Sequence, residues 1–186
     1  ESGISGPSEI FEGQHGFLNQ VLRKDFDKNF YDFLDDKPTP KKITKTYIKF
    51  YPVEYHIQAV ADAALQLRNT HEELRETNDI ASIEIITYEA AVSIVGKDKA
   101  KWDPQTRETA DHSIPYITAV ALTDNKMWLD QFTEKRIKDP KIRPLMDKVK
   151  ILERPEFTEM YGYSFPAELT ITMNNERIFA CRVDFP

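Results

Sequence analysis

The sequence predicts an α+β domain, a two-layer sandwich in which helices pack on a largely antiparallel sheet. Two observations carry this prediction. Runs rich in Ile, Thr and Tyr, which are typical of strands, are interspersed with stretches whose apolar residues recur at helical spacing. Near the end of the chain, two strand-like runs follow one another across a short turn, and a hairpin of this kind joins antiparallel strands.

Length and composition fit one globular domain. The chain has 186 residues, of which 40% are hydrophobic and 30% are charged. Its formal net charge of -6 argues against a nucleic-acid partner, which usually requires a basic face. No apolar run approaches the roughly 20 residues that a membrane-spanning helix needs, and no signal-peptide pattern opens the chain. We therefore expect a cytoplasmic protein without a membrane partner.

A single cysteine, Cys181, excludes a disulfide within the chain and a multi-cysteine metal or iron–sulfur site. It lies in an alternating run, which is typical of a strand residue rather than a nucleophile. The first residue is Glu1 rather than Met, and the last residues follow directly on a strand-like run. We therefore expect a piece of a longer protein.

The first half of the chain begins with residues 1–40, which predict short helices because they hold more apolar surface than a linker needs. Residues 43–50 predict a strand. Pro52 then suits the first turn of a helix whose apolar stripe extends to about Arg68. Residues 80–91 predict a second strand, rich in Ile and Thr.

The second half begins with a polar loop at residues 97–109. A helix is predicted over residues 112–123, with Asp111 as its N-cap and Pro115 in its first turn. The remaining predicted elements are two short helices (127–135 and 140–148), a short apolar stretch (149–152) and a hairpin of residues 165–173 and 176–184 across Asn174 and Asn175, which accept positive φ.

Familiar catalytic motifs are absent from the sequence. There is no glycine-rich phosphate loop, no G-x-S-x-G and no H-E-x-x-H, and the four histidines have no metal-ligand spacing. A G-x-x-G pattern at Gly13 and Gly16 favours a turn between helical pieces. The remaining candidates are polar side chains near the starts of two predicted helices.

Lys49 stands at a predicted strand end, directly before a predicted helix start. A lysine there can hold a carboxylate with help from the helix N-terminus. The alternative, which residue statistics favour, is a solvated lysine. Glu54 and Gln58 share one face of the predicted helix, opposite its apolar stripe, and an ordinary wet face is the simpler interpretation.

His112 and Tyr116 are four residues apart and are expected to project from one helix face. A histidine and a tyrosine that point into a cleft can serve as acid, base or hydrogen-bond donor. The alternative is structural: Asp111 caps the helix, His112 bonds locally and Tyr116 packs its ring in the core.

Four segments resemble the MmgE/PrpD family, in the family's order. They are Gly6-Pro7-Ser8-Glu9-Ile10-Phe11-Glu12-Gly13 with His15-Gly16-Phe17, Lys49-Phe50-Tyr51-Pro52-Val53-Glu54-Tyr55-His56 through Ala61-Asp62-Ala63-Ala64, Lys101-Trp102-Asp103-Pro104 through Asp111-His112-Ser113-Ile114-Pro115-Tyr116, and Phe165-Pro166-Ala167-Glu168. The family includes 2-methylcitrate dehydratase, cis-aconitate decarboxylase and iminodisuccinate epimerase.

The resemblance implies a two-domain architecture. Family members pair a large all-helical domain with a smaller α+β lid domain. On this basis residues 41–186 are expected to be the lid, and residues 1–40 to join it to a missing N-terminal helical domain that carries the acid and base. The resemblance also implies a homodimer and a reaction that needs no metal or other cofactor.

The resemblance further implies a hydro-lyase that dehydrates 2-methylcitrate to 2-methyl-aconitate in propionate breakdown. Lys49 is expected to bind a carboxylate of this small polycarboxylate, and Tyr116 to hydrogen-bond the substrate or the leaving oxygen. Glu54, His56 and His112 are expected at the pocket rim, with His112 as a second catalytic candidate. The family's decarboxylases tend to have a histidine in place of Glu54, which favours the dehydratase. The alternatives are a related decarboxylase or epimerase activity, or a non-catalytic carboxylate-binding domain.

Overall fold

The structure is a computed structural model that describes residues 46–186. The helical segment expected over residues 1–40, with its G-x-x-G pattern and first family-like segment, lies outside the described residues. The chain divides into two units, Glu1–Tyr47 and Ile48–Pro186, and the description below concerns the second unit and the two residues that precede it.

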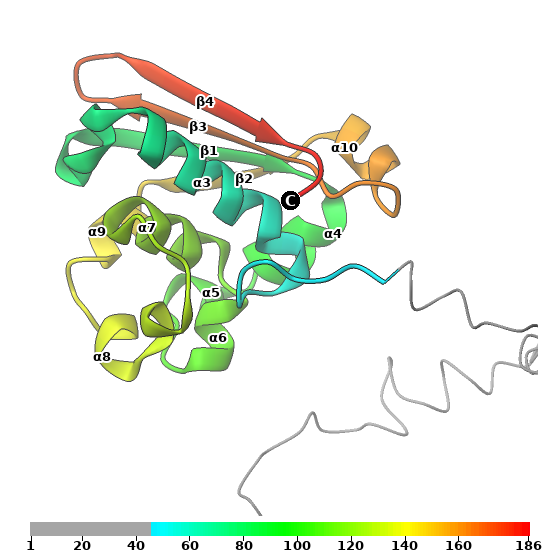
Figure 1. Cartoon of the computed structure of the whole chain (residues 1–186), viewed down its shortest axis with the longest axis horizontal. Coiled ribbons are helices and arrows are strands. Elements are labelled where there is room, and N and C mark those ends of the chain that lie inside the picture. The colour runs from blue at the N-terminus through cyan, green and yellow to red at the C-terminus, as the bar shows by residue number, and fades with distance from the viewer. Residues whose placement is uncertain (1–45) are drawn as a thin grey trace, which may run out of the picture. The chain divides into compact units, whose positions relative to one another are not determined.

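Four strands form one sheet in the order β2-β1-β3-β4 (Figure 1). They are β1 (Ile80–Thr87), β2 (Val149–Glu153), β3 (Ala167–Met173) and β4 (Ile178–Val183). Strand β1 pairs in parallel with β2 and antiparallel with β3, and β3 pairs antiparallel with β4. The predicted α+β class with a largely antiparallel sheet is confirmed.

Strands β3 and β4 form the predicted hairpin, in which Leu169 lies opposite Cys181. The positive φ of the turn falls on Glu176 (67°) and not on the two asparagines, so the expectation for Asn174 and Asn175 was wrong. Glu176 donates its N–H to the carbonyl of Met173 at 2.9 Å, which closes the turn around this residue. A left-handed conformation costs a non-glycine residue about 1–2 kcal/mol, which the ladder on either side offsets.

Helices α3 (Gln58–Thr70) and α7 (Ile114–Asp124) lie on one face of the domain, and α3 packs on β3, β4 and α7 (Figure 1). The apolar stripe predicted for the first of these helices is confirmed. Its start was predicted too early: a 3₁₀ turn, η3 (Tyr55–Ile57), precedes α3, so the regular helix begins six residues after Pro52.

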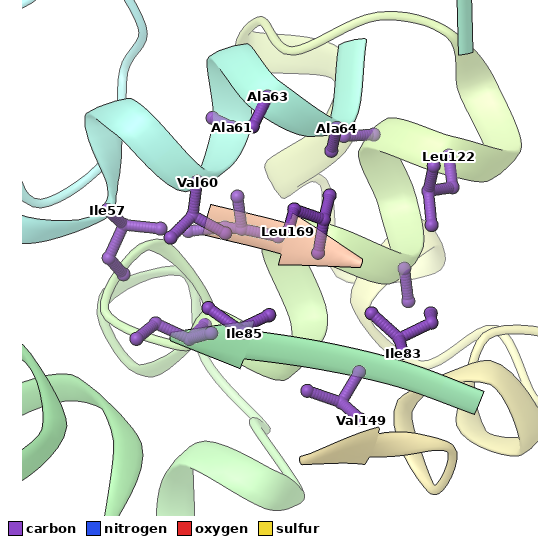
Figure 2. Close-up of a cluster of buried hydrophobic side chains, with 14 of the residues drawn as sticks. Ile57, Val60, Ala61, Ala63, Ala64, Ile83, Ile85, Leu122, Val149 and Leu169 are labelled. Atoms are coloured by element: carbon purple, nitrogen blue, oxygen red, sulfur yellow. The ribbon is translucent and has the colours of Figure 1, made fainter. Parts of the chain in front are cut away.

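The core lies between these helices and the sheet (Figure 2). Strand β3 alternates strictly between buried and half-buried residues, so one face of the sheet is buried in the core and the other is partly exposed to solvent. Ile83, Ile85 and Leu169 are fully buried from the sheet side. Each such side chain contributes about 1.5–3 kcal/mol on burial. From the helix side, Val60 and small alanines such as Ala64 let α3 approach closely.

Short helical pieces connect β1 to β2. In chain order they are α4 (Glu89–Ala91), a π-helical turn η6 (Val92–Gly96), α5 (Lys99–Trp102), α6 (Arg107–Asp111), α7, η7 (Leu129–Phe132), α8 (Glu134–Ile137) and α9 (Arg143–Met146). The strand predicted to continue to residue 91 ends at Thr87, opposite the last residue of β2, Glu153, and the chain then turns into α4. The predicted polar loop instead holds α5 and α6.

The remaining helical pieces are η4 (Glu72–Arg75), η5 (Thr77–Asp79) and α10 (Pro155–Met160). The two short helices predicted after α7 correspond to η7 with α8 and to α9. The apolar stretch that follows them is the edge strand β2. Helix α10 was not predicted from the sequence. Among the described residues, the helices are too short or too polar to cross a membrane.

Candidate functional site

The segment around Lys49 is irregular rather than a strand. Residues 46–49 form neither helix nor strand, and all are exposed. The predicted strand over residues 43–50 is therefore wrong for its described part, because none of the strands in the described sheet pairs with these residues. Lys49 is exposed and makes no ion pair with the residues that the structure describes.

Glu54 brings the two candidate segments together. Its N–H donates to the carbonyl of Asp111, the last residue of α6, over 2.9 Å. The segment that contains Lys49 and Glu54 thus lies against the end of α6, where His112 follows. Residues more than 50 positions apart in the chain meet at this one backbone hydrogen bond.

The Glu54 side chain caps the 3₁₀ turn η3. Its Oε2 accepts the backbone N–H of His56 over 2.7 Å, and Oε1 lies 3.9 Å from Nε2 of the same histidine. The carboxylate is 16% exposed. Glu54 therefore combines a structural cap with a half-buried negative charge beside an imidazole.

His56 faces the protein rather than solvent. Its side chain is 13% exposed, and Nδ1 lies 2.6 Å from the hydroxyl of Tyr88. Burial lowers the pKa of the imidazole, and the Glu54 carboxylate opposes this only in part. Burial first, and then the Glu54 charge, raise the pKa of the Tyr88 phenol, so this group stays protonated. The carboxylate near Nε2 favours a proton on that nitrogen, so Nδ1 accepts from the Tyr88 O–H.

Aromatic rings from separate elements surround His56. Tyr88 stacks on Tyr161 with ring centroids 4.8 Å apart, and Tyr55 meets Phe165 edge-on at 4.7 Å. We call these four residues with His56 the aromatic cluster. Tyr88 and Tyr161 were not predicted from the sequence, because Tyr88 fell inside the strand expected over residues 80–91 and neither tyrosine stands in a family-like segment.

His112 lies at the end of α6 and not on the following helix. Its Nδ1 is 2.5 Å from Oδ1 of Asp111 and 3.0 Å from the carbonyl of Glu108. The side chain is 40% exposed, and Nε2 has no hydrogen-bond partner among the described residues. A carboxylate on one ring nitrogen fixes the orientation of the ring and leaves the other nitrogen for a ligand.

Tyr116 occupies the core. Helix α7 begins at Ile114 with Ser113 as its N-cap, so the predicted Asp111 cap and the shared helix face of His112 and Tyr116 were both wrong. The Tyr116 side chain is fully buried and its hydroxyl donates to the carbonyl of Gln131 over 2.5 Å. Burial is the main cause that raises the pKa of this phenol. Its expected contact with substrate stays a prediction.

Gln58, predicted to lie on a wet face, is 1% exposed. Its amide bonds to the main chain of the turn between Lys49 and Glu54. The wet-face interpretation was wrong because the helix begins later than predicted, and its first residue points back under the preceding turn. The sequence signal was a glutamine near the start of a predicted helix, which is too common to be distinctive.

One hollow in the described part of the chain, of about 220 Å³, is lined by Phe50, Tyr51, Asp62 and Pro186, and Phe50 directly follows Lys49 in the sequence. Another, larger hollow of about 440 Å³ lies beside the hairpin turn and is lined by Glu73, Glu76, Asp79, Met173, Asn174 and Asn175. Arg177 pairs with Glu73 at 2.6 Å, but the carboxylates of Glu76 and Asp79 would still repel an anionic ligand, so the larger hollow does not suit a polycarboxylate. Within the described residues no group of three or more His, Cys, Asp and Glu side chains is arranged to hold a metal ion.

The candidate site thus consists of Lys49, Glu54 and His56 on one segment and His112 on another. The backbone hydrogen bond from Glu54 to Asp111 joins the two segments. The sequence profile of the MmgE/PrpD C-terminal domain matches residues 51–186, which include most of this site and the whole sheet. The chain belongs to the MmgE/PrpD family.

Several curated relatives of this chain are named as 2-methylcitrate dehydratases. The chain is 35% identical over 115 residues to "2-methylcitrate dehydratase, mitochondrial" of Yarrowia lipolytica, a match that covers 60% of this chain and 21% of the relative. It is 29% identical over 170 residues to 2-methylcitrate dehydratase of Cupriavidus necator, covering 86% and 34%. It is 30% identical over 112 residues to the Escherichia coli enzyme of the same name, covering 60% and 23%. The matches thus span about a fifth to a third of the length of these relatives.

Proposed function

We propose that this chain is the part of a hydro-lyase that binds the carboxylates of 2-methylcitrate during its dehydration to 2-methyl-aconitate. Family membership and the names of the relatives support this proposal. The structural observation that carries it is the hydrogen bond from Glu54 to Asp111, because it joins the Lys49 segment to the His112 segment.

The chemistry needs cations, an acid and a base. Dehydration removes a proton from the carbon next to a carboxylate and expels a hydroxyl from the neighbouring carbon, which leaves a double bond and one water. Negative charge develops on the carboxylate as the proton leaves, and a fixed cation stabilises that charge. Lys49 is an exposed cation in the segment that resembles the family, two residues before the part that the family profile matches, and we assign it this role.

The remaining residues act around this lysine in the proposed site. His112, held by Asp111, offers Nε2 as a donor or acceptor to the substrate or the leaving oxygen. Glu54 limits how many carboxylates the site accepts, because its own charge repels a misplaced one. Tyr88 orients the His56 ring through its hydroxyl, and the backbone N–H of His56 donates to the Glu54 carboxylate and holds it in place. We expect the main acid and base to come from the family's helical domain.

The homodimer, the propionate route, independence from cofactors and the cytoplasmic location stay predictions.

A chimera tests the proposed function. The chain is joined behind the N-terminal region of the Cupriavidus necator relative, in place of that relative's own matching third, and 2-methylcitrate dehydration is followed by the absorbance of the product's new double bond. We expect turnover by the chimera and none by the 186-residue chain alone.

The controls separate misfolding from a wrong function. The relative's unmodified enzyme gives the reference rate, and cooperative unfolding of the chimera shows that it is folded. A folded chimera without turnover would contradict the hydro-lyase and favour a non-catalytic carboxylate-binding domain. Decarboxylation of cis-aconitate in place of dehydration would favour the related family activity.

A further inference from the structure

The side-chain amide of Gln58 makes four hydrogen bonds to the main chain of the turn at residues 50–53. Oε1 accepts the N–H of Phe50 at 3.2 Å and of Tyr51 at 3.0 Å. Nε2 donates to the carbonyl of Tyr51 at 2.8 Å and to that of Val53 at 3.2 Å. A glutamine amide has two lone pairs and two hydrogens, so its capacity is filled.

This turn has few other ways to satisfy its main chain. It lies before η3 and outside the sheet, and Pro52 in its centre has no N–H to donate. Three of the four hydrogen bonds are partly buried and the one to Val53 is buried, and a main-chain group left unpaired away from water costs about 1–3 kcal/mol. One buried side chain at the start of α3 therefore holds the conformation of the turn.

The turn is covalently continuous with Lys49. The peptide unit between Lys49 and Phe50 is planar, and it includes the Cα of both residues. Gln58 binds the N–H of this unit, so it fixes the plane that begins at the Lys49 Cα. The Lys49 side chain itself is exposed and has no ion pair within the described part of the chain. The position of its Cα, and so the region that its ammonium group can reach, therefore depends on this backbone.

We propose that Gln58 is a positioning residue that places Lys49 for a substrate carboxylate. The inference rests on the proposed role of Lys49. A lysine on a loose loop would lose conformational freedom when it binds a ligand, and this loss weakens binding. The four hydrogen bonds of Gln58, which we call the Gln58 clamp, already restrict this backbone in the free protein. Less conformational entropy of Lys49 is therefore lost when the ligand binds.

Two substitutions at Gln58 remove the clamp in different ways. Gln58→Met keeps the length of the side chain and removes all four hydrogen bonds. Gln58→Glu keeps the shape and the acceptors but loses both donors and sets a carboxylate against two carbonyls. Gln66→Met is the matched control, because Gln66 lies two turns further along the same helix, is exposed and bonds only to side chains.

The first measurement is hydrogen exchange of single amides in the chain itself, by NMR. We expect the amides of Phe50 and Tyr51 to exchange about tenfold faster or more in Gln58→Met, to change less in Gln58→Glu, which keeps an acceptor for both N–H groups, and to stay unchanged in Gln66→Met. The amides of Leu169 and Ile171 in β3 report the core and should stay protected. Unchanged exchange at Phe50 and Tyr51 in Gln58→Met, or loss of β3 protection in that variant, would overturn a local role of Gln58.

The second measurement is steady-state kinetics of the same variants in the chimera. We expect the KM for 2-methylcitrate to rise on the order of tenfold and kcat to fall by a smaller factor, because a misplaced lysine weakens the binding of the substrate carboxylate and, less strongly, the stabilisation of the charge that develops on it. An unchanged KM in a folded Gln58 variant would overturn the positioning role. If the parent chimera shows no turnover, the proposed function fails and the role assigned to Gln58 fails with it, whereas the exchange result still decides whether the clamp exists.

Discussion

His56 is a buried imidazole between a carboxylate and a phenol, and its protonation is tied to folding. Its pKa is lowered mainly by burial, with Glu54 acting in the opposite direction. An unfolded histidine takes up a proton near pH 6.5, whereas folded His56 does so only at lower pH. Between these two values the unfolded chain binds more protons, so acid favours unfolding.

The free energy of unfolding is therefore expected to fall as the pH drops below about 6.5, with this residue contributing at most about 1.4 kcal/mol per pH unit. His56→Gln keeps a partner for the Tyr88 hydroxyl and removes the titration. Urea unfolding at pH 7.5, 6.5 and 5.5 measures the effect. The parent chain should lose more stability over this range than His56→Gln, and parallel losses in the two proteins would contradict the assignment.

At the residue scale, Lys49, Glu54 and His112 were selected from the sequence because they stand in segments that resemble a family, and their roles stay predictions. The contacts of Gln58 and Tyr88 were not predicted, because they depend on where a helix begins and on which side chains meet across the fold. Neither is visible in local spacing. Cys181 lies in strand β4 as predicted, and burial raises the pKa of its thiol, which disfavours the reactive thiolate.

Helix α7 illustrates how one cap fixes an element. Its N-cap, Ser113, is fully buried, accepts the N–H of Tyr116 at 3.1 Å and donates to the carbonyl of Lys101. The residue therefore ties α7 to the end of α5. The cap also separates α7 from α6, and this break leaves His112 at a helix end.

Ser113→Ala is expected to lower the free energy of unfolding by about 1–3 kcal/mol, because it leaves a buried N–H and a carbonyl without partners. Thr106→Ala is the matched control: Thr106 caps the short helix α6 through the N–H of Thr109, but it is exposed. We expect its loss to be less than half as large. Equal losses in thermal or urea unfolding would contradict the importance of the buried cap.

The predicted elements were right where periodicity ran over many residues and wrong at their ends. Strands β3 and β4 and helices α3 and α7 follow long apolar patterns. The strand expected around Lys49 was wrong because strand propensity needs a neighbouring strand to pair with, and the described sheet offers none there. Helix α10 escaped prediction because it is six residues long and carries only Phe157 into the core.

At the scale of the whole molecule, the negative net charge disfavours an anionic ligand, whereas the proposed site at Lys49 favours one. The chain carries -6 overall, yet the proposed ligand is a polycarboxylate. The acidic side chains that line the larger hollow lie beside the hairpin turn, whereas the Lys49 segment meets the end of α6. This separation lets one cation act on a carboxylate although the molecule is acidic.

The central claim is that Lys49 binds a carboxylate of the substrate. Its most direct test is kcat/KM of the chimera for 2-methylcitrate with Lys49→Ala, compared with Lys150→Ala. Lys150 is an exposed lysine on the edge strand β2, and among the described residues its ion pair is a long surface contact to Glu84 at 3.9 Å. We predict that Lys49→Ala lowers kcat/KM by about 30-fold or more, as expected for the loss of one charged contact of about 2 kcal/mol, and that Lys150→Ala leaves it unchanged. Equal kcat/KM values for the two folded variants would contradict the account.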